Sequence, residues 1–155
     1  MFKFPSTVEV IANSDEEAKE FTENAKKYGA SVKDVSVWTG PVPPNSFIEM
    51  APNVQMASPE YMFLRKSNQL PFEDAVMVGC ALLSCFNTCY TSPTIEPGKA
   101  YWREDSHTDP LKIINYLLPI IGTKEAHRSL EVLDESLKHL LAFDAMCEVM
   151  ALCNE

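Results

Sequence analysis

Glycine and basic residues are scarce in this sequence of 155 residues. The five glycines leave little room for a glycine-rich loop that cradles phosphate. Lys and Arg number 13 against 22 Asp and Glu, so the formal net charge is −9. A domain that binds nucleic acid by itself normally carries a basic excess, so direct nucleic-acid binding is not expected. The acidic balance favours a soluble protein, a basic protein partner or a mimic of nucleic acid.

Long hydrophobic runs are also lacking. The most apolar stretch, Ala75–Phe86, is shorter than the roughly 18 apolar residues that a membrane-spanning helix needs. The first residues, from Met1 to Ser6, contain no apolar segment typical of a signal peptide. We therefore expect a cytoplasmic protein without a membrane partner.

The cysteines form no C-x-x-C pair, and the three histidines are scattered. The odd number of cysteines and their apolar helical surroundings favour reduced thiols over a disulfide framework. We therefore predict no metal site and no cofactor. The cysteines are Cys80, Cys85, Cys89, Cys147 and Cys153.

The apolar content of 46% is enough for one hydrophobic core. We predict a single α+β domain over residues 1–155, with a β-rich front at 1–57 and a helical back at 58–155. Its small, mostly antiparallel sheet of about four strands carries one helix and packs against about five helices. The predicted strands are Val8–Ala12, Ser31–Thr39 with a bulge, Phe47–Met50 and Val54–Met56.

Capping signals place the helices. Ser14 with Glu17 forms a capping box, and Gly29 is placed to end that helix. Ser58 and Asp109 each stand before a proline, which is the favoured order at a helix start. The predicted helices begin at Ser14, Ser58, Pro71, Asp109, Thr123 and Asp144.

The segment Thr91–Thr108 is predicted to be a loop of about 18 residues, and loops of that length are uncommon without a functional reason or disorder. Trp102 beside Arg103 is the best candidate for a binding hot spot. The predicted partner-binding residues are Tyr101, Trp102, Arg103, Glu104, Asp105 and His107.

No catalytic signature is found, and we predict that the protein is not an enzyme. Asp105, His107 and Asp109 could hold a divalent ion, but Asp109 is explained as a helix cap. Cys85 or Cys89 could act as a nucleophile, but an apolar helix raises the pKa of a thiol. Glu148 could be one carboxylate of a metal-dependent nuclease, but such a site needs several carboxylates that converge on the metal.

The segments Val37–Phe47 (VWTGPVPPNSF) and Val54–Glu60 (VQMASPE) resemble the middle region of bacterial proteins related to the AbiEi-type antitoxin and transcriptional regulator. Some of these proteins carry a C-terminal endonuclease domain like that of very-short-patch repair. The apolar helix Glu73–Phe86, the start Pro110-Leu111 and the segment Arg128–Leu130 follow in the same order. The resemblance extends from about Val8 to about Cys153.

Two parts of the longer relatives have no counterpart here. Nothing in Met1–Ala12 matches their winged-helix DNA-binding head. The catalytic Glu of their nuclease domain corresponds to Glu148 or is replaced by Cys147, and the carboxylates that should follow are missing. The resemblance therefore implies the connecting module alone, without the DNA reader or the nuclease.

These observations predict an antitoxin-like, non-enzymatic module of bacterial defence or mobile-element context that binds and occludes a protein partner. Three alternatives stay open. The first is an acidic phage-type counter-defence inhibitor that mimics DNA or resembles an anti-CRISPR protein, and the second is a degenerate metal-dependent nuclease relative that uses Glu148. The third is a scaffold that homodimerises through Met146, Val149, Met150 and Leu152 of the last helix.

Overall fold

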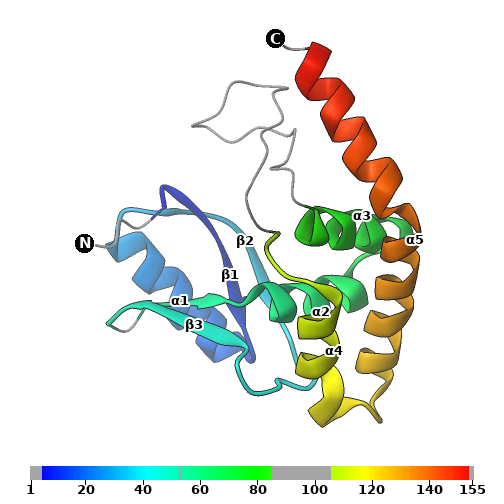
Figure 1. Cartoon of the computed structure of the whole chain (residues 1–155). Helices are drawn as coiled ribbons and strands as arrows, with labels where there is room; N and C mark the ends of the chain where they lie inside the picture. Colours follow the sequence, from blue (N-terminus) through cyan, green and yellow to red (C-terminus); the bar gives the residue numbers. More distant parts are fainter. Residues whose placement is uncertain (1–4, 53, 85–105, 154–155) are drawn as a thin grey trace. The chain divides into compact units, whose positions relative to one another are not determined.

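A computed structural model describes residues 5–52, 54–84 and 106–153, and for residues 147, 148 and 150–153 it describes the backbone alone (Figure 1). The chain divides into two compact units. One unit comprises Met1–Pro41 and Glu49–Gln55, and the other comprises Val42–Ile48 and Met56–Glu155. The last of these boundaries lies close to residue 57, where the sequence changes from β-rich to helical.

The first unit is built around a β-α-β arrangement. Strand β1 (Thr7–Ala12) and strand β2 (Ser31–Val37) pair in parallel, and helix α1 (Asp15–Lys27) connects them. The register shifts between Val8 and Glu9, so Lys33 has no partner in β1, which confirms the predicted bulge. The indole nitrogen of Trp38 then donates to the carbonyl oxygen of Pro41 at 2.9 Å.

The capping box and the terminating glycine predicted for α1 are both confirmed. The Ser14 hydroxyl accepts from the backbone N–H of Glu17 at 3.1 Å, and the Glu17 carboxylate accepts from the N–H of Asn13 at 2.9 Å. Gly29 adopts φ of 81°, a left-handed conformation that favours glycine at a helix end.

The prediction of one mostly antiparallel sheet is wrong. The four strands form two separate pairs, β1 with β2 and β3 (Phe47–Ala51) with β4 (Val54–Ala57). The first pair is parallel because α1 carries the chain back to the start of β1, and a crossover of this kind brings the next strand in the same direction.

The helical part of the second unit begins with α2 (Pro59–Gln69) and α3 (Phe72–Leu83). Helix α4 (Pro110–Leu117) continues into a short 3₁₀ helix, η1 (Leu118–Ile120), and α5 (Lys124–Cys153) follows. Helices α2, α3 and α5 pack against one another. Their fully buried side chains include Tyr61, Phe63, Leu64, Ile113, Leu117 and Val132.

Two helices that the sequence predicts separately form one continuous helix. The starts predicted at Thr123 and Asp144 both belong to α5, which continues for 30 residues. No glycine or proline occurs between Thr123 and Glu155, so nothing in the sequence ends the helix near Asp144. The i,i+4 spacing of Asp134 and Lys138 predicts an ion pair on the exposed face of this helix, and Nζ of Lys138 lies 3.2 Å from a carboxylate oxygen of Asp134.

The guanidinium of Arg65 in α2 points into the second unit. Arg65 is buried, and its guanidinium donates to the Tyr61 hydroxyl at 3.1 Å and lies 5.4 Å from the centre of the Tyr61 ring. The Tyr61 ring meets the Phe47 ring edge-on at 5.1 Å. Arg65 is therefore part of the core of this unit.

Tyr116 makes the second unit less stable as the pH becomes alkaline. Its buried phenol shares a 2.6 Å hydrogen bond with the Ser46 hydroxyl, and burial raises its pKa well above the ordinary value. An unfolded chain releases this proton near pH about 10, whereas the folded chain keeps it. The stabilisation is therefore complete below that pH and is lost as the pH rises above it.

We expect Tyr116→Phe to flatten the fall of Tm that the wild-type protein shows between pH about 9 and about 11. Thermal unfolding followed by circular dichroism at several pH values measures this. Tyr28→Phe is the control, since Tyr28 is exposed and this variant should follow the wild-type profile. Equal slopes for Tyr116→Phe and wild type would show that Tyr116 does not carry the effect.

Candidate functional site

The predicted binding loop lies almost entirely outside the described residues. This holds for Tyr101, Trp102, Arg103, Glu104 and Asp105, so their predicted role stays a prediction. His107 is described and exposed, in a bend that precedes α4.

The end of this segment is anchored to the second unit. The backbone N–H of Thr108 donates to the carbonyl oxygen of Leu82 at 3.2 Å. Asp109 accepts from the backbone N–H of Lys112 at 2.9 Å, which confirms its role as a helix cap. The cap explains the presence of Asp109 at this position without a metal.

Close packing joins α3 to α5 (Figure 1). A Cβ atom placed on Gly79 would lie 2.3 Å from the Ser136 hydroxyl oxygen. That hydroxyl donates to the carbonyl oxygen of Val76 at 3.3 Å, and the Cys80 thiol donates to the carbonyl oxygen of Ser136 at 3.5 Å. Small side chains therefore bring the two helices together and align the residues beside the contact.

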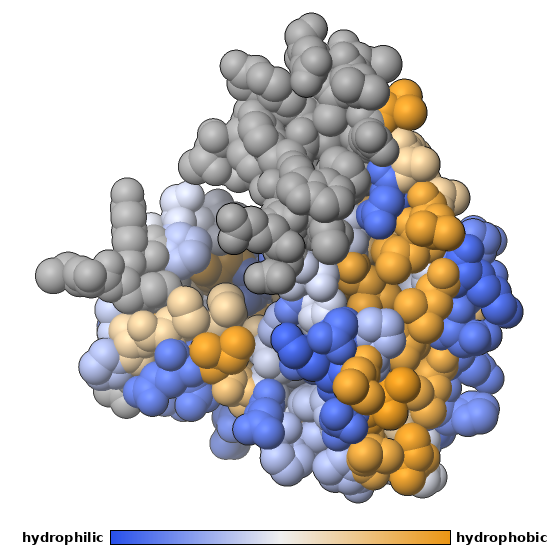
Figure 2. Space-filling model, in the orientation of Figure 1, coloured by the Kyte–Doolittle hydropathy of each residue, from blue (hydrophilic) through white to orange (hydrophobic). Residues whose placement is uncertain are grey.

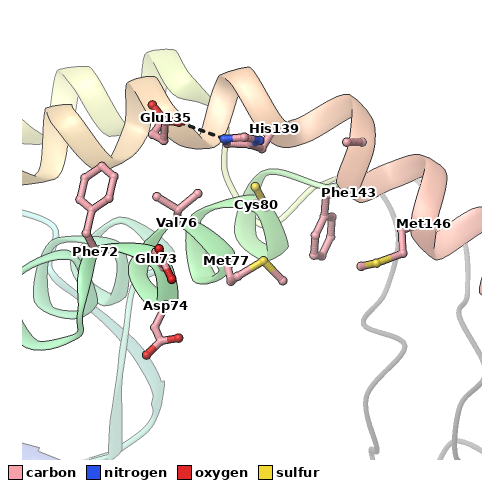
Figure 3. A pocket seen from close by; sticks show the side chains of 11 residues that line it. Phe72, Glu73, Asp74, Val76, Met77, Cys80, Glu135, His139, Phe143 and Met146 are labelled. Carbon is pink, nitrogen blue, oxygen red and sulfur yellow. Dashed lines mark hydrogen bonds and ion pairs between the residues drawn. The ribbon is translucent and has the colours of Figure 1, made fainter.

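A groove of about 680 Å³ lies beside this contact, between α3 and the middle of α5 (Figure 3). Helix α3 supplies one side and α5 supplies the other. The lining residues are Phe72, Glu73, Asp74, Val76, Met77, Cys80, Glu135, His139, Ala142, Phe143 and Met146.

The floor of the groove is apolar. Val76, Cys80 and Phe143 are buried there, while Met77 and Met146 are 44% and 41% exposed. Figure 3 shows Phe143 and Met146 on α5 reaching the side on which Met77 leaves α3. Methionine side chains are flexible and polarisable, so this floor can adapt to apolar groups of different shapes.

Carboxylates stand on both sides of this floor. Glu73 and Asp74 are exposed in the first turn of α3, where they also interact favourably with the helix dipole. Glu135 on α5 is half-buried, and its carboxylate lies 2.9 Å from Nε2 of His139 and 3.6 Å from Nζ of Lys138. The groove therefore combines an apolar floor with an acidic rim.

The groove chemistry favours binding over nucleophilic attack. Burial, with a smaller contribution from the Asp144 carboxylate, raises the pKa of the Cys80 thiol, so Cys80 is protonated at neutral pH. Cys85 and Cys89, which were considered as nucleophiles and judged unsuited to that role, lie outside the described residues, as does the side chain of Glu148.

Within the described ranges, no three His, Cys, Asp or Glu side chains are placed to hold a metal ion together. A search of the same residues finds no helix with the length and apolar character needed to cross a membrane.

The sequence alone does not predict this groove. The helix that contains Met77 is apolar on nearly all sides, which predicts a place at the centre of the fold, whereas Met77 is exposed. Met146, which is part of the predicted dimer seam, lines the groove. The available signal was the pairing of the acidic helix start Glu73-Asp74 with a methionine one turn later.

No protein-family model, curated protein or solved structure matches this chain.

Proposed function

We propose that this chain is a non-enzymatic protein-interaction module whose groove between α3 and α5 receives a cationic amphipathic helix of a partner protein. The observation that carries the proposal is the combination of an apolar floor with carboxylates supplied by both helices. By binding a basic helix of the partner in this groove, the module would block the surface that the helix forms on the partner.

The shape and chemistry of the groove suit a helix. A helix bound in a groove places apolar side chains at positions i, i+3, i+4 and i+7 against the floor and leaves its other side chains at the rim. Val76, Met77 and Phe143 offer that floor. Lys or Arg at the edges of the bound helix would face Glu73, Asp74 and Glu135, as charge complementarity requires.

The net charge supports the same class of partner. A formal charge of −9 attracts a basic protein over a distance and accelerates its association. Together with the resemblance to AbiEi-type proteins, it supports an antitoxin-like regulatory role in a defence or mobile-element context. The apolar floor distinguishes this proposal from DNA mimicry, which needs rows of carboxylates and no apolar floor.

The acidic rim can be tested with a synthetic amphipathic helix of about 18 residues, some 27 Å long, made of Leu on one face and Lys on the other. We expect Glu73→Lys/Asp74→Lys/Glu135→Lys to weaken binding of this peptide about tenfold, or about 1.4 kcal/mol. Fluorescence anisotropy with labelled peptide at about 0.15 M salt measures the dissociation constant.

The matched control carries the same change in net charge on α1, in the other unit. Glu16→Lys/Glu20→Lys/Glu23→Lys replaces three exposed acids and should change the dissociation constant less than about threefold. If both triple variants weaken binding equally, the peptide responds to net charge alone and the proposal is wrong. A scrambled peptide of the same composition should bind weakly to every variant.

A further inference from the structure

A second apolar surface covers α4, η1 and part of α5. Figure 2 shows it as a continuous orange band over these elements. Its large side chains are well exposed, up to 66% for Leu111 and 84% for Leu141. We call this surface the α4 band, and it comprises Leu111, Ile114, Leu118, Ile121, Leu137 and Leu141.

The α4 band follows from helical spacing. Leu111, Ile114 and Leu118 are separated by three and four residues, so they share one face of α4 and its 3₁₀ extension. Ile113 and Leu117 lie on the buried side of the same helix. Helix α4 is therefore apolar on two sides, and the core of the unit uses one of them. A contiguous exposed apolar patch of this kind marks an interaction surface.

We propose that the α4 band is a self-association surface that receives the same band of a second copy of this chain. A twofold axis places identical surfaces against each other, so the surface must be complementary to itself. None of the six side chains of the α4 band is ionisable. Each copy carries a formal net charge of −9, so two copies repel one another where their acidic surfaces meet. The uncharged α4 band is a surface at which they can approach closely.

The edge of the α4 band fits the same arrangement. Nζ of Lys112 lies 3.9 Å from a carboxylate oxygen of Asp109, and both side chains are substantially exposed. In a twofold pair of α4 helices, Lys112 of each copy can turn to Asp109 of the other. Opposite charges at the rim of an apolar centre are the usual anatomy of a protein interface.

Self-association through the α4 band would leave the groove open. Leu137 and Leu141 lie one turn apart on one side of α5, whereas Glu135, His139 and Met146 line the groove on another side. A dimer would therefore present two grooves and could bind a partner with two basic helices more tightly than a monomer does. This inference rests on a different surface from the proposed function.

Sedimentation velocity over roughly 1 to 200 µM protein tests the inference. The wild-type mass should rise from 17.4 kDa toward twice that value as the concentration increases. We expect Leu111→Asp/Leu118→Asp to raise the dimer dissociation constant at least about 30-fold, since each copy then brings charges to the centre of the interface. Circular dichroism should show an unchanged fold, because both positions are exposed.

Met50→Asp/Met56→Asp is the matched control, with the same added charge at two exposed positions outside the α4 band. It should dimerise like wild type. A wild-type protein that stays monomeric throughout, or a dimer that both variants weaken equally or neither weakens, would overturn the inference. Leu111→Asp/Leu118→Asp should still bind the Leu/Lys peptide in the groove, so failure of the dimer and failure of the groove are distinguished.

Discussion

Replacing Gly79 with valine should lower the free energy of unfolding by about 3 kcal/mol, because the contact between α3 and α5 has no space for a side chain. A Cβ atom at this position would lie 2.3 Å from the hydroxyl oxygen of Ser136 and 3.1 Å from Cε2 of Phe63. Ser136 and Phe63 are both buried, so neither can move into solvent. Urea unfolding followed by circular dichroism measures the loss.

Two further variants test whether this clash causes the loss of stability. Gly122→Val makes the same substitution where no atom lies within 4 Å of the added Cβ, and it should change stability by less than about 1 kcal/mol. Ser136→Ala removes the nearest atom, so Gly79→Val should cost about 1 kcal/mol less in that background. Additive effects of Gly79→Val and Ser136→Ala would contradict the proposed contact.

Placing two cations in the floor of the groove should weaken binding of the Leu/Lys peptide at least about 100-fold, or about 2.7 kcal/mol. The variant is Met77→Lys/Met146→Lys. Both side chains line the groove and are partly exposed, so the free protein should keep its stability to within about 1 kcal/mol. In the complex, however, each ammonium group would be buried beside an apolar or cationic side chain of the peptide.

The matched control is Met50→Lys/Met56→Lys, which adds the same charge at two exposed methionines that do not line the groove. It should change the dissociation constant less than about twofold. Fluorescence anisotropy with the same labelled peptide compares the two variants. If the control weakens binding as much as Met77→Lys/Met146→Lys does, the peptide does not bind in the groove.

Local features of the fold could be predicted from the sequence. The caps at Ser14, Ser58 and Asp109 and the left-handed Gly29 are confirmed, because each depends on residues within one helical turn. The α+β class and the positions of the four strands are confirmed for the same reason.

The pairing of the strands was predicted wrongly, although the order of elements held the signal. A strand, a helix and a second strand favour a parallel crossover over a hairpin. The helix start predicted at Asp144 is likewise wrong, because no helix-breaking residue occurs there and α5 continues through it.

The groove could not be derived in the same way. It depends on the contact of Gly79 with Ser136, which are 57 positions apart in the sequence, and on the exposed fraction of Met77 after α3 and α5 pack. Periodicity identifies an apolar helix but does not say which neighbour covers each side. The loop residues Tyr101–Asp105 lie outside the described part, so their predicted role stays a hypothesis.

The most direct test of the proposed function is site-specific photocross-linking in the organism that encodes the protein. A photoreactive benzoylphenylalanine replaces Met77 in the groove or, as the control, Met50 in the other unit. We predict that position 77 alone cross-links to a protein, through a segment with apolar residues at helical spacing and Lys or Arg beside them. Equal cross-linking at both positions, or attachment at position 77 to an acidic segment, would contradict the proposal.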